Sequence, residues 1–224
     1  MEFKEFDTGA IRYIIRYPSG YKEGERYPVL LFLHGAGTRG FAYEKVEKNA
    51  FFENIAKYED FPAIVVAPIC DGETWFDQFE SLKELYISMA TADFADPDRV
   101  YILGLSMGGY ATWQLAMSLP EYTAAIVPVC GGGMYWNAAR LKHVPVWAHH
   151  GALDKVVCPE ESVKMVEAVK RAGGEATLTI YDGVEHASWL PVYKNYGVFE
   201  WLFSKRRFGS KVDDTTYSDA ERFG

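Results

Sequence analysis

The stretch that decides the fold is "GLSMGGYATW" at residues 104–113, in which a single serine, Ser106, stands among glycines. The residues before it, "DRVYILGLS", form a short apolar run rich in β-branched and aromatic side chains, which is typical of a buried strand. The residues after it, "MGGYATWQLAMSLP", repeat apolar side chains at helical spacing and stop at Pro120. Ser106 therefore stands where we expect a strand to become a helix.

The five residues G-L-S-M-G match the pattern G-x-S-x-G, in which a serine occupies a strained turn between a strand and a helix. Gly104 and Gly108 leave room for the backbone to pass closely at such a turn. The turn lifts the hydroxyl above the sheet edge and places the amide of Met107 at a helix N-terminus. A plain tight turn is the alternative, but the position between strand and helix favours a nucleophilic serine.

Short apolar runs alternate with helical patterns along most of the chain, which predicts one three-layer α/β domain over residues 1–204. The runs from Pro28 onward lack polar alternation, as in strands of a mostly parallel sheet with helices on both faces. The expected strands are 11–17, 28–34, 63–68, 99–105, 124–129, 144–150 and 176–181, and the expected helices are 44–57, 79–92, 107–118, 159–172 and 192–204.

The C-terminal residues 205–224 lose this periodicity. We expect them to form a mobile tail, or alternatively an arm that orders against a second copy of the chain in a homo-oligomer.

Composition narrows the class of protein. The chain has 31 acidic and 23 basic residues, and its net charge of −8 argues against nucleic acid or an anionic membrane as a partner. No apolar run approaches the roughly 18 residues of a membrane helix, and the first residues lack the features of a signal peptide. Cys70, Cys130 and Cys158 lack metal-ligand spacing and fit buried thiols in a reducing compartment. We expect a cytoplasmic protein.

A nucleophilic serine needs a base, and the base needs a group that orients it. In the fold that carries G-x-S-x-G, the chain order is serine, acid, histidine. Four histidines follow Ser106, and among them His186 alone leaves a separate acid-bearing loop in between. It lies in "YDGVEHASW", after the expected strand 176–181, and is our candidate base; a surface-loop imidazole is the alternative.

The acid is expected to follow the strand 144–150, where "HHGALDKVV" supplies Asp154. A carboxylate on that loop can accept the imidazole N–H of His186 and stabilise the imidazolium. Asp182 and Glu185, on the loop of the histidine itself, are the rival candidates.

The oxyanion of the tetrahedral intermediate needs two N–H donors. We expect one from Met107 and the other from the glycine-rich "LHGAG" loop, with Ala36 favoured over Gly35 and Gly37. The pattern of a phosphate-binding P-loop, G-x-x-x-x-G-K-[ST], is absent from the sequence, which argues against that use of the loop.

The other histidines have structural interpretations. His34 ends an expected strand and is predicted to bond the backbone of the loop that follows. His149 and His150 are neighbours on a strand, so their side chains face opposite sides and rarely share one ion. We therefore expect no metal and no other cofactor.

Taken together, "LHGAGTRG", "GLSMGGYATWQLA", "CGGG", "HGALDKVV" and "GVEHASW" cover the chain from about residue 30 to 190 and resemble the α/β-hydrolase superfamily, in particular its small serine esterases. The branch they look like contains feruloyl esterase-like, dienelactone hydrolase-like and phospholipase/carboxylesterase-like enzymes, and it is similar to the catalytic domain of prolyl-oligopeptidase-type peptidases. The resemblance implies an α/β-hydrolase fold, a triad of Ser106, Asp154 and His186, and an oxyanion hole of Ala36 and Met107. The chain departs from dienelactone hydrolases in its nucleophile, which is a cysteine in those enzymes.

Residues 131–143, where larger relatives carry a lid, are too few for a helical cap domain, so we expect an open site without a large lid. Aromatic side chains on loops at the carboxyl edge of the sheet would then supply substrate contacts, with ordinary packing as the alternative for each ring. The candidate substrate-binding residues are Trp75, Phe76, Tyr135, Trp136 and Trp189.

These features predict a serine carboxylester hydrolase that works through an acyl-enzyme. Its partner would be a small-molecule or oligosaccharide-linked ester, with hydroxycinnamoyl or aryl esters preferred and short-chain acyl esters next. A serine peptidase that acts on short peptides and a catalytically silent hydrolase fold used for binding are the two alternatives.

Overall fold

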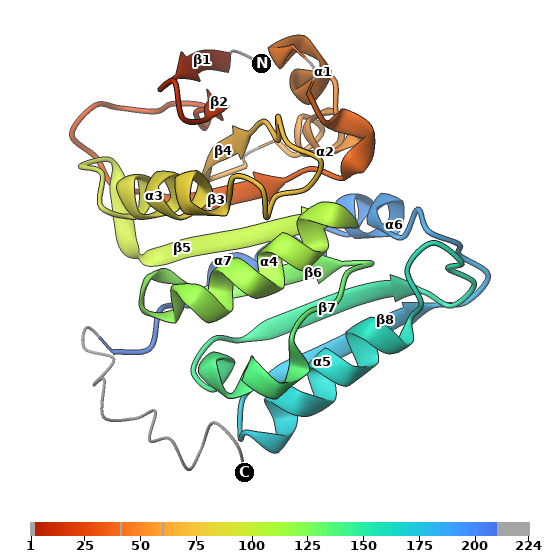
Figure 1. Ribbon diagram of the computed structural model, residues 1–224. Coiled ribbons are helices and arrows are strands. Elements are labelled where there is room, and N and C mark those ends of the chain that lie inside the picture. The colour runs from red at the N-terminus through yellow and green to blue at the C-terminus, as the bar shows by residue number, and fades with distance from the viewer. Residues whose placement is uncertain (1–2, 41, 60, 210–224) are drawn as a thin grey trace.

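An eight-stranded sheet with helices on both faces forms the described part of the computed structural model, residues 3–40, 42–59 and 61–209 (Figure 1). Its strands lie in the order β1-β2-β4-β3-β5-β6-β7-β8. Strands β3 to β8 run parallel to one another, and β1 and β2 pair antiparallel at one edge. The strands are β1 (Phe3–Asp7), β2 (Arg12–Arg16), β3 (Tyr27–Leu33), β4 (Ile64–Pro68), β5 (Ala95–Leu105), β6 (Ala125–Val129), β7 (Val146–Gly151) and β8 (Ala176–Tyr181). The predicted fold class is confirmed.

Two sets of helices cover the sheet. Side chains of α3, α4 and α5 pack on one face, and side chains of α1, α2, α6 and α7 pack on the other. The helices are α1 (Tyr43–Glu47), α2 (Ala50–Ile55), α3 (Phe79–Ala90), α4 (Met107–Ser118), α5 (Glu160–Arg171), α6 (Trp189–Lys194) and α7 (Tyr196–Ser204), with short 3₁₀ helices η1 (Ala36–Thr38), η2 (Pro120–Tyr122) and η3 (Tyr135–Leu141).

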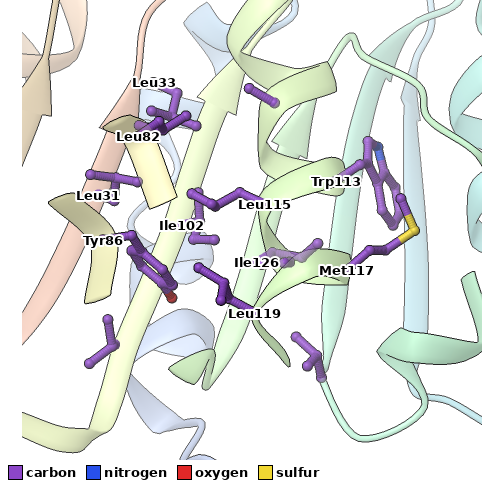
Figure 2. Packing of buried hydrophobic residues seen from close by; sticks show 14 of the residues in the cluster. Leu31, Leu33, Leu82, Tyr86, Ile102, Trp113, Leu115, Met117, Leu119 and Ile126 are labelled. Atoms are coloured by element: carbon purple, nitrogen blue, oxygen red, sulfur yellow. The ribbon is translucent and has the colours of Figure 1, made fainter. Parts of the chain in front are cut away.

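Strand β3 lies inside the sheet, and its residues form a continuous apolar run because side chains on both of its faces are buried. Leu31 and Leu33 pack with Leu82 and Leu115 under α3 and α4 (Figure 2), whereas the next side chain along the strand, Phe32, belongs to the cluster on the opposite face. Successive strand residues point to opposite faces, and here both faces are buried. Each such side chain contributes roughly 1.5–3 kcal/mol when it is fully buried.

The expected helices 44–57 and 192–204 are each broken into two. At both breaks an asparagine, Asn49 or Asn195, has a non-helical backbone, and its side-chain oxygen accepts a hydrogen bond from the amide two residues later. Asparagine is a strong N-cap because its side chain satisfies an amide that has no partner within the helix. Each break is therefore the start of a new helix.

Two strand boundaries also differ from expectation. Strand β1 was not predicted, because Phe3–Asp7 is a short edge strand whose side chains are exposed or only half-buried. Strand β5 begins at Ala95 rather than at 99, where Ala95 pairs with Tyr27 of β3 before a shift in register. Pairing with a neighbouring strand, rather than local hydrophobicity, extends it.

The start of the expected tail is held against the domain. The hydroxyl of Tyr101 donates to the carbonyl oxygen of Lys205 at 2.7 Å, and the amide of Arg207 donates to the carbonyl oxygen of Asp98 at 2.9 Å. These hydrogen bonds place residues 205–207 against β5. Residues 210–224 lie outside the described residues. Within the described chain, no helix has both the length and the apolar content needed to cross a membrane.

Candidate active site

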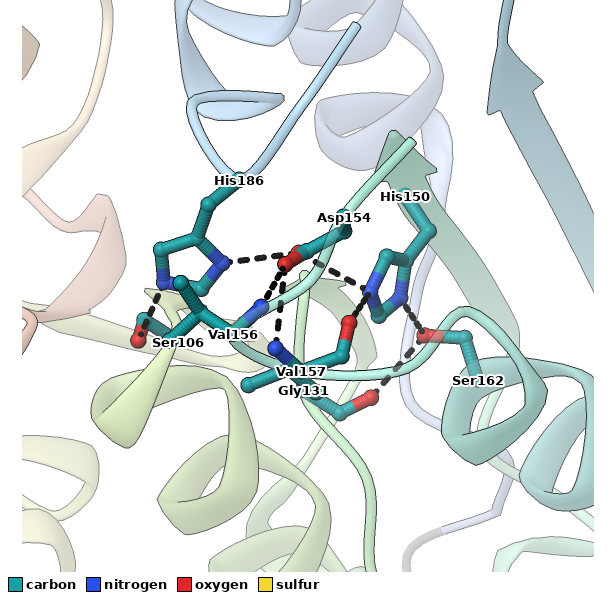
Figure 3. Close-up of polar contacts among 8 residues, drawn as sticks. All are labelled: Ser106, Gly131, His150, Asp154, Val156, Val157, Ser162 and His186. Carbon is teal, nitrogen blue, oxygen red and sulfur yellow. Dashed lines mark hydrogen bonds and ion pairs between the residues drawn. The ribbon is translucent and has the colours of Figure 1, made fainter. Parts of the chain in front are cut away.

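Three loops at the carboxyl edge of the sheet bring Ser106, His186 and Asp154 together (Figure 3). The side chains follow β5, β8 and β7 respectively. Nδ1 of His186 lies 2.7 Å from Oδ2 of Asp154, and Nε2 of His186 lies 2.9 Å from Oγ of Ser106. Because an ionised carboxylate only accepts hydrogen bonds, Nδ1 carries the proton and donates it. In the neutral ring, Nε2 is then free to accept the hydroxyl proton of Ser106.

The turn at Ser106 has the geometry that its glycines suggest. Ser106 has φ 54° and ψ −117°, a conformation that L-residues rarely adopt. A Cβ on Gly104 would lie 2.3 Å from the carbonyl oxygen of Gly108, and a Cβ on Gly108 would lie 2.0 Å from that of Leu33. Both distances are far below van der Waals contact. The glycines are therefore required so that α4 can approach β3 and β5 at this turn.

Asp154 is buried, with 5% of its surface exposed, and it is satisfied on both carboxylate oxygens. Oδ1 accepts hydrogen bonds from the amides of Val156 and Val157, and Oδ2 accepts from His186. Burial alone would raise the pKa of Asp154, but these hydrogen bonds and the nearby His186 lower the pKa below its ordinary value. The group is therefore held as a carboxylate.

Backbone contacts hold the acid loop against the histidine loop. The amide of Leu153 donates to the carbonyl oxygen of Val184 at 2.9 Å. A Cβ on Gly151 would lie 2.1 Å from the carbonyl oxygen of Glu185, so only glycine fits where the loops cross. The rival acids Asp182 and Glu185 have exposed side chains, and the carboxylate that His186 meets is that of Asp154.

The two expected oxyanion donors lie at the starts of helices. Met107 is the first residue of α4 and Ala36 is the first residue of η1, so neither amide has an acceptor inside its own helix. The loop of Ala36 comes close to the serine: a Cβ on Gly35 would lie 3.6 Å from Cβ of Ser106. This arrangement leaves both amides near the serine turn.

His34 holds the loop that contains Ala36. Its Nδ1 donates to the carbonyl oxygen of Gly35 at 2.8 Å, and its Nε2 accepts from the amide of Cys70 at 3.1 Å. Burial lowers the pKa of His34 to about 4, although the hydrogen bond to Gly35 opposes the shift. The ring is therefore neutral, and the expected structural role of His34 is confirmed.

Residues 73–194, more than half of the chain, match the Dienelactone hydrolase family. The chain belongs to the dienelactone hydrolase family. The matched residues include all three side chains of the candidate site, Ser106, Asp154 and His186.

Among the solved structures and curated proteins that this dienelactone hydrolase family member resembles are several esterases. A thermostable esterase superposes with a TM-score of 0.78 at 30% identity, over 92% of this chain and 63% of that chain. Est1E from Butyrivibrio proteoclasticus superposes with a TM-score of 0.68 at 16% identity, over 91% and 98%, which shows the shared fold. Carboxylesterase SOBER1 from Arabidopsis thaliana is 24% identical over 190 residues, 70% of this chain and 82% of the relative.

Other curated relatives are much longer than this chain. Endo-1,4-beta-xylanase Y from Acetivibrio thermocellus is 26% identical over 143 residues, but the chain spans only 13% of its length. Two further curated relatives are also longer, a bifunctional acetylxylan esterase/xylanase from Neocallimastix patriciarum and a poly(3-hydroxyalkanoate) depolymerase from Paucimonas lemoignei. The chain spans 20% and 32% of their lengths, respectively.

One of the expected substrate-binding rings of this family member lies in the core. Trp75 is fully buried, and its indole N–H donates to the carbonyl oxygen of His34 at 3.0 Å. Its ring also packs against the imidazole of His34, with 4.9 Å between the centroids. The assignment of Trp75 to the rim is therefore wrong, because the indole fills the space under the loop of Ala36.

The remaining rings are accessible. Phe76, Tyr135 and Trp136 are 50%, 48% and 61% exposed. Trp189 is half-buried and meets His186 edge-on, with 5.5 Å between the ring centroids. Phe76, on the loop before α3, borders a hollow of about 710 Å³ between α3, α4 and the loop after β6.

The lining of this hollow includes residues that the sequence analysis missed. Phe79 and Tyr110 line it from α3 and α4, and Gly132 and Met134 line it from the loop after β6. Tyr110 stands one helical turn after Ser106, at the same edge of the sheet. The helical spacing of Tyr110 relative to the serine, and the position of the "CGGG" motif directly after a strand, were the signals that could have identified this hollow.

A resident metal does not fit the candidate site. Cys130, Asp154 and His186 offer ligand atoms within 4.8 Å of one another. Burial raises the pKa of the Cys130 thiol to about 12, so the thiol stays protonated. A ligating thiol must be deprotonated, and the other two groups already bond each other. His149 and His150 point to different partners, Tyr181 and Ser162, as expected for strand neighbours.

Proposed function

We propose that this protein is a serine carboxylester hydrolase that works through an acyl-enzyme, with Ser106 as nucleophile, His186 as general base and Asp154 as the orienting carboxylate. The observation that carries the proposal is the hydrogen-bonded chain from Ser106 through His186 to Asp154. Family membership and the similarity to a thermostable esterase support it.

The chemistry follows from this chain of hydrogen bonds. His186 takes the hydroxyl proton as Oγ of Ser106 bonds to the ester carbonyl carbon. Asp154 stabilises the imidazolium that forms. As the tetrahedral intermediate collapses, His186 returns the proton to the leaving alcohol and the acyl group stays on Ser106. Water then attacks the acyl carbon of the acyl-enzyme while His186 takes one of its protons, and the collapse of this second tetrahedral intermediate releases the acid as His186 returns the proton to Oγ of Ser106.

The amides of Met107 and Ala36 are the proposed oxyanion donors. Both are free of acceptors in their own helices, and Met107 follows the nucleophile directly. Amides fixed in this way need no rearrangement when the oxyanion forms, and each is worth roughly 3–4 kcal/mol in the transition state.

For the substrate, we propose hydroxycinnamoyl or aryl esters, with short-chain acyl esters next. The hollow beside α4 supports this choice, because the aromatic side chains of Phe76, Phe79 and Tyr110 line it together with the apolar Met134. Est1E, which shares the fold, has also been solved with ferulic acid bound. A cytoplasmic location and a homo-oligomer stay predictions from the sequence.

The test compares hydrolysis of p-nitrophenyl acetate, a feruloyl ester and an aminoacyl-p-nitroanilide by the wild type and Ser106→Ala. We expect the wild type to cleave both esters faster than the anilide, and the variant to cleave neither while keeping its melting temperature. A fluorophosphonate probe is expected to add one phosphonyl group to the wild type only. Faster cleavage of the anilide would favour a peptidase, which the likeness to a dipeptidyl peptidase family member from Caenorhabditis elegans makes the second candidate. Labelling of Ser106→Ala would overturn the assignment of the nucleophile.

A further inference from the structure

Asp154 has a second histidine neighbour that the proposed reaction does not use. Nε2 of His150 lies 3.2 Å from Oδ2 of Asp154, the same oxygen that His186 bonds, and the side chains of His150 and Asp154 are both fully buried. In Figure 3 the carboxylate stands between the two imidazoles. His150 is the penultimate residue of strand β7, whereas His186 lies on the loop after β8.

The surroundings of His150 offer acceptors to both ring nitrogens. Nε2 lies 2.9 Å from the carbonyl oxygen of Val157 and so carries a proton that it donates there. Nδ1 lies 2.7 Å from Oγ of Ser162, and the hydroxyl of Ser162 donates to the carbonyl oxygen of Gly131 at 2.9 Å. A hydroxyl has one proton to donate. Because the carbonyl oxygen of Gly131 has no proton of its own, every contact carries a proton only when the hydroxyl donates to Gly131 and Nδ1 of His150 donates to Ser162.

A ring that donates from both nitrogens is an imidazolium. A buried cation is costly unless an opposite charge lies beside it, and here the carboxylate of Asp154 does so at 3.2 Å. The carbonyl oxygen of Val157 and the hydroxyl of Ser162 fix the plane of the His150 ring. The charge pair is therefore held in one orientation.

We propose that His150 is a positioning residue of the candidate triad, a buried imidazolium that fixes Asp154 from the side away from His186. The proposal rests on the proposed function, because the orientation of Asp154 matters for turnover only if His186 is the base. In this arrangement the carboxylate shares its negative charge between two rings. His150 then limits how strongly Asp154 can stabilise the protonated form of His186.

Few other titratable groups face this pair. From the loop after β8 the carboxylate meets His186, and from the end of β6 it lies near Cys130, whose thiol stays protonated. Tyr110 of α4 lies within electrostatic range of Asp154, and burial raises the pKa of that phenol, so it stays neutral. From α5, His150 meets the uncharged Ser162.

The test substitutes His150→Gln, which keeps a side-chain donor but removes the cation. We expect kcat on p-nitrophenyl acetate to fall roughly tenfold to a hundredfold through misplacement of the carboxylate, with KM nearly unchanged. The acid limb of the kcat/KM profile is expected to move to higher pH by about one unit, because the full charge of Asp154 then stabilises protonated His186.

The matched control is His149→Phe. This residue is a buried histidine on the same strand that points to Tyr181 instead, so its substitution should leave the acid limb and kcat in place. Ser162→Ala removes the partner of Nδ1 and is expected to shift the acid limb in the same direction as His150→Gln, by less. A folded His150→Gln variant with wild-type kcat and an unmoved acid limb would overturn the proposal.

A second measurement does not depend on the folding of any variant. In wild-type protein labelled with ¹⁵N-histidine, with ring signals assigned through bonds to the His150 backbone, both ring nitrogens of His150 are expected to be protonated at pH 7. A single protonated nitrogen would overturn the imidazolium even if the enzyme is active. Equal ester turnover by the wild type and Ser106→Ala would instead overturn the proposed function, and the nitrogen signals would still report on His150.

Discussion

Asp154 uses its two carboxylate oxygens for two different purposes. Oδ1 is bonded by the amides of its own loop, which fixes the side chain, and Oδ2 faces the imidazole of His186 on one side and that of His150 on the other. Because the loop already holds the carboxylate, the ring of His186 is oriented without an adjustment when it takes up a proton. An amide in this position would offer an N–H as well as an oxygen, and could face the ring with the wrong group.

We therefore expect Asp154→Asn to lower kcat for ester hydrolysis by roughly 10⁴-fold, because the histidine would be held in the wrong tautomer. Steady-state kinetics measure the loss, and Asp182→Asn is the control, since that exposed carboxylate lies on the histidine loop. Near-normal turnover by Asp154→Asn together with a collapse in Asp182→Asn would place the acid on the other loop.

Among the accessible rings, Phe76 and Trp189 are expected to act differently. Phe76 is half-exposed at the hollow beside α4, whereas Trp189 packs edge-on against His186. A ring that touches only a large acyl group affects only substrates that reach it, but a ring that supports the base affects every substrate.

Phe76→Ala is expected to lower the ratio of kcat/KM for a feruloyl ester over an acetyl ester by about tenfold, which corresponds to about 1.4 kcal/mol of ring contact. Trp189→Ala is expected to lower both esters by a similar factor and leave the ratio in place. If the ratio is unchanged in Phe76→Ala, the hollow does not hold the aromatic acyl group.

At the scale of elements, the turn from β5 to α4 depends on contacts between backbones. A side chain on Gly104 or Gly108 would collide with backbone carbonyl oxygens, that of Gly108 in α4 and that of Leu33 in β3 respectively. Such atoms cannot move without shifting a helix or a strand. The motif therefore sets the distance between the elements as well as the position of Ser106.

Gly108→Ala is expected to lower the free energy of unfolding by about 3 kcal/mol or more, since overpacking costs 1–3 kcal/mol even where side chains can adjust. Urea denaturation measures it. Gly37→Ala is the control, because a Cβ there has no atom within 4 Å. Equal stability of the two variants would show that the turn tolerates a side chain.

The helices illustrate what local sequence can and cannot determine. The pattern of α4 predicted its bounds at 107–118, because its apolar face, its glycines and the following proline all lie within one segment. The breaks at Asn49 and Asn195 were missed because apolar spacing continues across both. Their capping side chains were a local signal that outweighed the periodicity.

For the whole molecule, two buried histidines couple stability to pH. Burial lowers the pKa of His34 to about 4 and that of His149 to about 3. Between these values and the ordinary histidine pKa of about 6.5, the unfolded chain binds protons that the folded protein does not. The free energy of unfolding therefore rises with pH in this window. The part of it that these two histidines contribute is lost progressively as the pH falls below about 6.5.

His149→Phe removes one of these groups. Between pH 4 and 6, we expect the slope of unfolding free energy against pH to decrease by about 1.4 kcal/mol per pH unit, the value for one proton. Denaturant titrations at several pH values measure the slope, and His34 still supplies its share in the variant. An unchanged slope would mean that His149 binds protons equally well in the folded and unfolded states.

The sequence by itself determined the layered α/β fold, since the order of apolar runs and helical patterns is local information and both faces of the inner strands are apolar. It also determined which side chains could form the candidate triad, because parallel strands place their carboxyl-end loops at one edge. The tertiary structure alone decided which of the loop side chains face solvent and which face each other. Trp75 is buried and Phe76 is exposed although they are neighbours, and His150 meets Asp154 because β7, α5 and the loop after β6 converge there. Such contacts depend on how distant segments pack, and the pattern of any one segment does not contain them.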